Sequence, residues 1–418
     1  MEKQNAPTHA QVFFTVQPVA QALARLMAAS TPLPRPVEVP VSQALGRVIC
    51  AAPTSPADLP AFVRSAMDGY AVRAADTFGA SEGLPAYLRV VGHVTMGSAP
   101  DFRVGAGEAA DIHTGGMLPP GADAVVIIER THALPGGEIE VLAPVAPGEN
   151  LVQIGEDVRR GNVILPTGHT LRPQDIGGLL AVGITRVSVA APPKVALLGS
   201  GDELVPPEQT PGPGQVRDIN SQTLAALFQA AGAETELLGI AADTFEALLS
   251  LAQQAFERAD IVVLTAGSSV STRDLTREVI SQLGAPGVLQ HGLAVKPGKP
   301  TILAACDGKP VIGLPGNPVS AFLVARQIVL PLIQAALGAP LEPARTQSAT
   351  LTANIASTTG REDSVPVSLT RNDEAWLATP IFGKSNLIYT LVNAQGVVKV
   401  PLNSNGLKAG AVVDVELF

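Results

Sequence analysis

The sequence predicts a multidomain protein that combines one α/β module with β-rich parts. From Lys194 to about residue 337, apolar strand runs alternate with helical segments, which is typical of a parallel sheet covered on both faces. Residues 87–142 and about 338–418 instead show short β-rich runs separated by turns. The length of 418 residues is sufficient for roughly two to four domains.

The individual elements follow from local spacing. Residues 18–29 show helical spacing, with Val19, Leu23 and Met27 on one face. Pro18 suits the first position of that helix, where its missing N–H costs nothing. Residues 58–70 contain prolines and are expected to form a loop that leads into a short strand. In the later parts, helices are expected at 174–182, 221–231, 244–259, 275–283 and 318–337, and strands at KVALLG, ETELLGI and DIVVLTAG.

The composition excludes several classes of protein. The net charge of −9 and the pI near 5.2 argue against a general nucleic-acid binder. Cys50 and Cys306 are the only cysteines and form no CxxC motif, so neither a disulfide framework nor a structural zinc is expected. The first residues lack the pattern of a secretion signal, and no membrane-spanning run is expected. We therefore expect a cytoplasmic protein with no nucleic-acid or membrane partner.

Four glycine-rich loops follow predicted strands of the α/β module. In an open parallel sheet, ligands bind at the carboxyl ends of the strands. One such loop alone is more often a plain tight turn. Four together, with lysines among them, indicate a phosphate site, because backbone N–H groups and helix N-termini bind anions. The loops are 199–203, 267–274, 296–300 and 313–318, and they contain Gly199, Gly201, Gly267, Lys296, Lys299 and Gly316.

Carboxylates in these loops leave two interpretations open. Asp202, Glu203 and Asp274 would suit Mg²⁺, which prefers oxygen ligands and bridges to phosphates. Asp274 directly precedes a predicted helix and would equally suit a helix cap. In the second part of the chain, Asp68 precedes Gly69, and spacing alone favours an ordinary Asp-Gly turn there.

Six motifs resemble the molybdopterin molybdenumtransferase family, which includes bacterial MoeA and the corresponding domain of gephyrin. They occur in order over nearly the whole chain, from about residue 16 to residue 418. SAMDGYA, KPGKP and GLPGNPVSA are highly specific in combination. The motifs are SAMDGYAVRAAD (65–76), GEDVRRGNVIL (155–165), GSGDEL (199–204), VRDINSQTLAALFQAAG (216–232), KPGKP (296–300) and GLPGNPVSA (313–321).

The resemblance implies an elongated subunit of four parts that forms a homodimer. Residues 1–60 and 151–192 would form an N-terminal and linker part, and residues 61–150 a β-rich inserted domain. Residues 193–338 would form a MogA-like α/β molybdopterin-binding domain, and residues 339–418 a C-terminal β-barrel.

The resemblance also implies a reaction. Molybdate is inserted into adenylylated molybdopterin, AMP is released and molybdenum cofactor forms. Mg²⁺ is the expected metal, and molybdate is a substrate. A MogA-type adenylyltransferase and apo-molybdoenzymes or their chaperones are further implied partners. The alternatives are a non-catalytic cofactor carrier or scaffold, a tungsten-preferring homologue, and an adenylyltransferase that acts one step earlier.

The family motifs also imply roles for residues of this chain. The expected catalytic residues are Asp68, Thr114, Glu203 and Asp274. The expected metal ligands are Asp274, Glu203 and Asp157. Substrate or oxyanion binding is expected of Lys296, Lys299, Ser269, Ser320, Arg361, Gly199, Gly201, Gly267 and Gly316.

Two loops depart from the usual residues of the family. Ala266 and Ser271 stand where glycines are common, and a Cβ restricts how closely a loop approaches its ligand. His113 and Gly116 differ from the commonest residues around Thr114. His113 is expected to be a surface or packing residue, because no second histidine lies at metal-ligand spacing in the sequence. These departures would affect the choice between molybdate and tungstate, or the activity.

Overall fold

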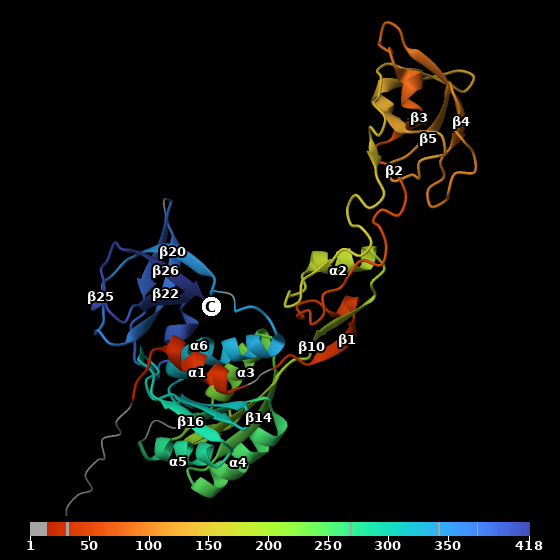
Figure 1. Cartoon of the computed structure of the whole chain (residues 1–418). Helices are drawn as coiled ribbons and strands as arrows, with labels where there is room; N and C mark the ends of the chain where they lie inside the picture. Colours follow the sequence, from red (N-terminus) through yellow and green to blue (C-terminus); the bar gives the residue numbers. More distant parts are fainter. Residues whose placement is uncertain (1–14, 31–32, 267–269, 342, 374) are drawn as a thin grey trace, which may run out of the picture.

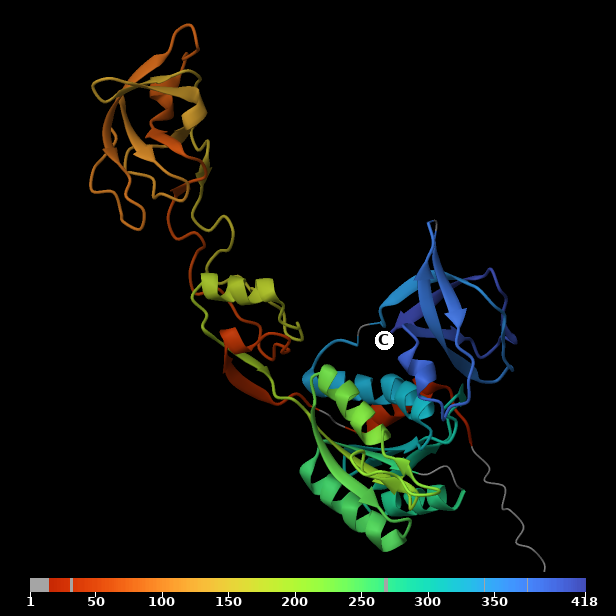
Figure 2. The ribbon, with the colours of Figure 1, turned by 180° about the vertical axis from the view of Figure 1, so that it is seen from behind.

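The subunit is elongated, with a β-rich insertion at one end of a narrow stalk and the α/β module at the other (Figure 1). The C-terminal barrel lies beside the α/β module, and Figure 2 shows the same arrangement from behind. The structure is a computed structural model that describes residues 15–30, 33–266, 270–341, 343–373 and 375–418, without the side chains of residues 266 and 270–274. The predicted multidomain fold class is confirmed.

A six-stranded sheet forms the centre of the α/β module, in the order β14-β11-β15-β19-β18-β16. The first four strands are parallel, as expected, whereas β18 is antiparallel to both of its neighbours. The expected parallel sheet is therefore present, with β18 as an antiparallel strand. The strands are β11 (Lys194–Ser200), β14 (Glu234–Ala241), β15 (Ile261–Ala266), β16 (Pro286–His291), β18 (Ile302–Cys306) and β19 (Lys309–Pro315).

The antiparallel pairing arises from a tight hairpin between β18 and β19. Asp307 and Gly308 form its turn, and both have positive φ angles, 47° and 81°. Two-residue turns with positive φ at both positions match the twist of the paired strands, and Asp-Gly is a preferred sequence for them. The Asp-Gly signal was therefore present in the sequence, but the strand–helix alternation around it favoured a parallel sheet.

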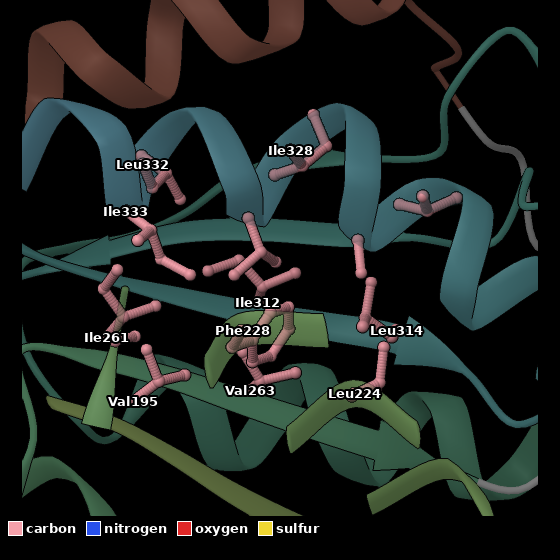
Figure 3. Close-up of a cluster of buried hydrophobic side chains, with 14 of the residues drawn as sticks. Val195, Leu224, Phe228, Ile261, Val263, Ile312, Leu314, Ile328, Leu332 and Ile333 are labelled. Atoms are coloured by element: carbon pink, nitrogen blue, oxygen red, sulfur yellow. The ribbon is translucent and has the colours of Figure 1, made fainter. Parts of the chain in front are cut away.

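Helices cover both faces of this sheet. α1 (Val19–Ala29), α3 (Asn220–Ala230) and α6 (Pro318–Leu337) pack on one face. α4 (Phe245–Arg258) and α5 (Val270–Ser281) pack on the other. Phe228 of α3 is fully buried in the first of these cores, and Figure 3 shows it among aliphatic side chains of the sheet and α6.

α6 is long and apolar enough to cross a membrane by length and composition alone, with a mean hydropathy of 1.6. In the structure, 61% of this stretch is buried, and its side chains form a core with α1, α3 and the sheet. A helix that is hydrophobic on most sides belongs either in a protein core or in a membrane. Because α6 is largely buried, its place in the protein core accounts for its apolar composition.

α5 begins earlier than the sequence predicts. The expected loop 267–274 is helical from Val270 onward, so Asp274 is the fifth residue of the helix. The capping interpretation of Asp274 is therefore wrong, because a cap precedes the first turn. The polar run Ser271-Thr-Arg-Asp274 carries no apolar periodicity, so spacing could not locate this turn.

The stalk consists of two passages of the chain that lie side by side. One ladder of two strands lies near the α/β module and another lies near the insertion, with a short helix between them (Figure 1). The elements are β1 (Pro36–Pro40) paired with β10 (Arg186–Ala190), β2 (Arg64–Ser65) paired with β9 (Leu151–Val152), the 3₁₀ helix Val41–Gln43 and α2 (Pro173–Ala181).

The insertion contains a six-stranded sheet in the order β6-β3-β5-β4-β8-β7. Gly69 opens β3 with a φ of 157°, and a Cβ there would lie 1.9 Å from the carbonyl oxygen of Val126, so only glycine fits after Asp68. The elements are β3 (Gly69–Val72), β4 (Ala86–His93), β5 (Glu108–Ile112), β6 (Ala124–Ile127), β7 (Thr131–Leu134), β8 (Glu138–Val141) and the 3₁₀ helices Ala74–Thr77 and Ile128–Arg130.

The C-terminal sheet closes into a barrel, because β22 pairs with β24 as well as with β23. The barrel strands are β20 (Thr346–Leu351), β22 (Glu362–Arg371), β23 (Trp376–Pro380), β24 (Gly396–Val400) and β26 (Val412–Leu417). The short elements are β12 (Leu204–Val205), β13 (Val216–Arg217), β17 (Val295–Lys296), β21 (Ile355–Ala356), β25 (Gly406–Leu407) and α7 (Tyr389–Val392).

Candidate functional site

Three of the four predicted glycine-rich loops, 199–203, 296–300 and 313–318, lie at one edge of the α/β sheet, and the fourth lies partly outside the described residues. β11, β15 and β19 are parallel, so their carboxyl ends meet there. β16 is antiparallel to β18, which is antiparallel to β19, so β16 also ends at this edge. The segment 296–300 follows β16 and therefore joins the other loops. This is the edge at which open α/β sheets bind ligands.

A pocket of about 780 Å³ opens between the α/β module and the barrel, and we call it the barrel-side pocket. Its walls come from residues 293–300, the start of α6 and two barrel segments, 355–366 and 381–390. Four of the predicted substrate-binding residues line it together, namely Lys296, Lys299, Ser320 and Arg361.

A buried carboxylate holds two of these cations in place. Asp363 has a side chain only 4% exposed and accepts a hydrogen bond of 2.9 Å from Nε of Arg361. Nζ of Lys296 lies 3.8 Å from the other oxygen of Asp363. β17 pairs with β22 in parallel register, with Lys296 opposite Asp363, which brings the loop and the barrel together. The pocket thus presents cations whose geometry is set by a buried anion.

Gly298 allows the lysine loop to lie against α6. Its φ is 113°, and a Cβ there would lie 2.3 Å from a methyl group of Val324. Because neither the backbone conformation nor the space admits another residue, Gly298 fixes the path of the loop between Lys296 and Lys299. The glycine between the two lysines is thus a requirement of packing.

A second pocket of about 800 Å³ lies over the ends of β11, β15 and β19, and we call it the strand-end pocket. Glu203 and Gly316 line it, and so do the first residues of α3 and α6. The Asn220 side chain donates a hydrogen bond of 2.8 Å to the carbonyl of Gly316, which joins the two helix N-termini. Helix N-termini favour anions, because their N–H groups are unpaired and the dipole is positive there.

Asn317 links the two pockets because it lines both of them. Its side-chain nitrogen donates a hydrogen bond of 2.9 Å to the hydroxyl of Ser385 in the barrel segment. Ser320, in the first turn of α6, is 4% exposed and lines the barrel-side pocket. The start of α6 therefore forms the boundary between a cationic pocket and a pocket lined by helix N-termini.

The first glycine loop is packed against carboxylates. Gly201 has a φ of 157°, and a Cβ there would lie 2.7 Å from a carboxylate oxygen of Glu203. Asp218, which sequence reasoning missed, is 6% exposed, lines the strand-end pocket and approaches Gly199. Its oxygens accept hydrogen bonds from the N–H and the hydroxyl of Ser221, at 3.1 and 2.6 Å.

Asp68 and Thr114 lie together in the insertion, at the other end of the subunit (Figure 1). Oδ1 of Asp68 accepts a hydrogen bond of 2.7 Å from the Thr114 N–H and one of 3.0 Å from the Thr114 hydroxyl. These bonds, with a smaller contribution from His113, hold the pKa of Asp68 below its usual value. The Asp-Gly turn expected from spacing is thus also a loop whose carboxylate is held ionised.

Three family models match the chain in order. They are the MoeA N-terminal region (domain I and II) at residues 17–183, a probable molybdopterin binding domain at 196–335 and the MoeA C-terminal region (domain IV) at 348–418. The molybdopterin molybdenumtransferase of Staphylococcus aureus (strain Mu50 / ATCC 700699) is 32% identical over 361 residues, which cover 86% of each chain. This chain belongs to the MoeA family.

Other members of the MoeA family agree over nearly the full length. Molybdopterin molybdenumtransferase 1 of Mycobacterium tuberculosis (strain CDC 1551 / Oshkosh) is 32% identical over 422 residues, covering 95% of this chain and 98% of its own. A crystal structure of a molybdopterin biosynthesis MoeA protein from Pyrococcus horikoshii has a TM-score of 0.84 and 38% identity, covering 96% and 99% of the two chains. The predicted family and the class of transferase enzyme are confirmed.

The described part of this MoeA chain does not place Asp157, Gly267, Ser269 or the Asp274 side chain at either pocket. Gly267 and Ser269 lie outside the described residues, and so does the side chain of Asp274. Asp157 lies in the stalk, where its N–H donates a hydrogen bond of 3.1 Å to the carbonyl of Leu59. In one chain it is thus separate from Glu203, and the predicted ligand set of Asp157, Glu203 and Asp274 is not assembled in the part that the structure describes.

The strand-end pocket offers few protein ligands for magnesium. Within the described ranges, no three His, Cys, Asp or Glu side chains group closely enough to hold a metal by themselves. Mg²⁺ usually takes one or two carboxylates and completes its shell with substrate phosphates and waters. Glu203 beside the anion-binding helix N-termini fits that mode of binding, whereas Asp157 does not.

Proposed function

We propose that this protein inserts molybdate into adenylylated molybdopterin, with release of AMP, to form molybdenum cofactor. The observation that carries the proposal is the pair of pockets that meet at Asn317. One of them is cationic, and the other lies at helix N-termini. Two different anions bound side by side are what this reaction requires.

The barrel-side pocket suits molybdate, which is a small tetrahedral dianion. Lys296, Lys299 and Arg361 supply three positive charges, and Asp363 offsets part of them. The fork of Arg361 and the hydroxyl of Ser320 would add directional hydrogen bonds to the oxyanion. Because Asp363 already orients Arg361 and Lys296, little reorganisation is needed when an anion enters.

The strand-end pocket suits the pyrophosphate linkage of the adenylylated substrate. The N-termini of α3 and α6 would contact its oxygens, and Gly316 would permit close approach of the backbone. Glu203 would hold Mg²⁺, and Asp274 is a further proposed ligand. When bound, the metal would polarise the phosphoryl group whose bond to AMP breaks.

We also propose that the active protein is a homodimer. Asp68 and Thr114 lie across the stalk from both pockets of their own chain (Figure 1). In a two-fold dimer, the insertion of one subunit would reach the pockets of its partner, and two equivalent sites would result. The protein would act in the cytoplasm, between a MogA-type adenylyltransferase and the apo-molybdoenzymes or their chaperones.

The test is to incubate the full-length protein with adenylylated molybdopterin, Mg²⁺ and either molybdate or tungstate, and to quantify AMP. Release of AMP that depends on the oxyanion is the expected result, and the preferred oxyanion decides between molybdenum and tungsten. EDTA is expected to abolish release and Mg²⁺ to restore it. Binding of the substrate with no release would instead support a non-catalytic carrier, and full turnover without metal would contradict the role of Mg²⁺.

A further inference from the structure

Asp68 belongs to a connected network of two histidines and two aspartates. The other members are His93, Asp111 and His113. His93 ends β4, Asp111 lies in β5, and His113 follows β5 directly. Asp68 immediately precedes β3, which pairs with β5. The sequence gives no metal-ligand spacing for these histidines, but parallel pairing of β4 with β5 places His93 opposite Asp111.

The contacts run from Asp111 to Asp68 through the two imidazole rings. Nδ1 of His93 lies 2.9 Å from Oδ2 of Asp111, which fixes the orientation of the His93 ring. The His93 and His113 rings meet edge to face, with centroids 5.4 Å apart at 73°. Nδ1 of His113 then lies 3.6 Å from Oδ1 of Asp68. Each carboxylate thus faces one imidazole, and each imidazole packs on the other.

The contacts to the Asp68 carboxylate converge on one of its two oxygens. Oδ1 lies near the N–H and the hydroxyl of Thr114 and near Nδ1 of His113. The side chain is still 59% exposed, so the carboxylate is held at one oxygen while the other is left to meet a ligand. A fixed and exposed carboxylate is what a loop needs if it is to enter a partner's pocket.

Such a carboxylate would meet an electrostatic obstacle in that pocket. The proposed substrates, molybdate and a pyrophosphate ester, are anions, and like charges at close range repel. A protonated imidazole beside Asp68 would neutralise the loop and remove most of this repulsion. His113 lies beside Asp68, where such a charge is needed. The His93 ring, which Asp111 orients, packs against the His113 ring and holds it in this orientation.

We propose that His113 is a positioning residue, which in its protonated form orients Asp68 and balances its charge so that the loop can approach an anionic substrate. The proposal rests on the proposed function and on the shared cleft. The lowered pKa of Asp68 agrees with it, since His113 contributes to that lowering after the two bonds from Thr114. The titratable groups of the network are Asp68 before β3, Tyr70 in β3, His93 in β4, Asp111 in β5 and His113.

The direct test is a ¹³C NMR titration of the Asp68 carboxyl in the full-length protein. His113→Gln is expected to raise the midpoint of the Asp68 titration, because it removes a cation that favours the carboxylate. The matched control is His132→Gln. His132 lies in the same domain, is similarly exposed and faces Glu140 at the same 3.6 Å, but does not touch Asp68. A midpoint that is unchanged by His113→Gln, or equally raised by His132→Gln, would overturn the proposal.

The second readout is the pH profile of AMP release. At pH 6.0, where imidazoles are largely protonated, His113→Gln is expected to lower kcat/KM about two- to fivefold, as for an exposed charge pair. The difference between the two proteins should shrink at pH 8.5, because alkali disfavours the charged form of an imidazole. A ratio that stays constant with pH would show a merely structural role and contradict the proposal. If the wild-type protein releases no AMP, the proposed function fails, while the NMR titration still decides the role of His113.

Discussion

The two ends of the subunit differ in the charge and the shape of what they offer a ligand. The α/β module and the barrel gather Lys296, Lys299 and Arg361 around a concave pocket. The insertion instead presents Asp68 on an exposed loop, at the far end of the stalk (Figure 1). The difference indicates that one chain holds the cationic pockets and the carboxylate apart, and that a complete site needs two chains.

The two ends also differ in how they are stabilised. The α/β module has a large aliphatic core on each face of its sheet, formed with α1, α3 and α6 on one side and with α4 and α5 on the other. The insertion has two smaller cores of its own, one on each side of its sheet, and among the residues that the structure describes it shares no buried cluster with the α/β module. Since stability is carried by separate cores, the two regions should respond independently to core substitutions.

The largest expected effect comes from Phe228→Ala. The ring is fully buried, and truncation of a buried phenylalanine costs about 3–5 kcal/mol. Hydrogen exchange followed by mass spectrometry should show lost protection in the α/β module and unchanged protection in the insertion. Phe78→Ala is the control, because Phe78 is 63% exposed and should change neither region. Equal loss of protection at both ends would show that the regions form one cooperative unit.

A smaller effect is expected from Lys299→Ala, which tests the role of the cationic barrel-side pocket in molybdate binding. A desolvated charge-assisted hydrogen bond contributes about 1.5–3 kcal/mol, so the affinity for molybdate should fall about tenfold or more. The melting temperature should remain close to that of the wild type, because the side chain is exposed. Calorimetric titration with molybdate measures the affinity, with Lys408→Ala as an exposed control in the barrel. Unchanged saturation by molybdate would remove Lys299 from the site.

The smallest effect is expected in the stalk that joins the two ends. Asp175 is buried and accepts a hydrogen bond of 2.8 Å from the Arg172 N–H at the start of α2. Asp175→Asn should cost about 1 kcal/mol, as for a lost helix cap. Chemical denaturation at several pH values measures this difference.

The loss of unfolding free energy caused by Asp175→Asn should depend on pH. Hydrogen bonds from Arg172 and from the His169 ring hold the pKa of Asp175 well below its usual range. A depressed carboxyl pKa stabilises the fold above about pH 4 and loses this contribution as the pH falls further. The difference between Asp175→Asn and the wild type should therefore shrink between pH 5 and pH 3. A difference that grows on acidification would contradict this account.

Local patterns predicted much of the fold. Helical spacing located α1 and α6 to within a residue, and three of the four glycine-rich loops, all but 267–274, lie at one edge of the sheet as expected. The wrong predictions occur where two local sequence patterns conflict, or where the sequence carries no apolar periodicity. The Asp307-Gly308 turn makes β18 antiparallel to both of its neighbours, and the polar first turn of α5 carries no apolar spacing.

The site was less accessible to sequence reasoning, because its support depends on distant pairing. Asp363 follows Arg361 by two residues but contacts Lys296 only because β17 pairs with β22 of the barrel. His93 and His113 likewise meet through the pairing of β4 with β5. The Asp218 carboxylate lay inside a motif that was noticed, but its burial at the strand-end pocket required the fold.

The shared cleft is the central claim, and subunit mixing tests it most directly. Asp68→Ala and Lys299→Ala proteins are mixed and allowed to exchange subunits, and activity is measured at a molybdate concentration low enough that each protein alone is nearly inactive. If Asp68 of one chain serves the pockets of its partner, each heterodimer has one site with both lesions and one site with neither. With random exchange, AMP release should recover to about a quarter of the wild-type value, since half of the dimers are heterodimers. A mixture that stays inactive after exchange has been verified by mass spectrometry would contradict the claim, because both residues would then serve a site within one chain.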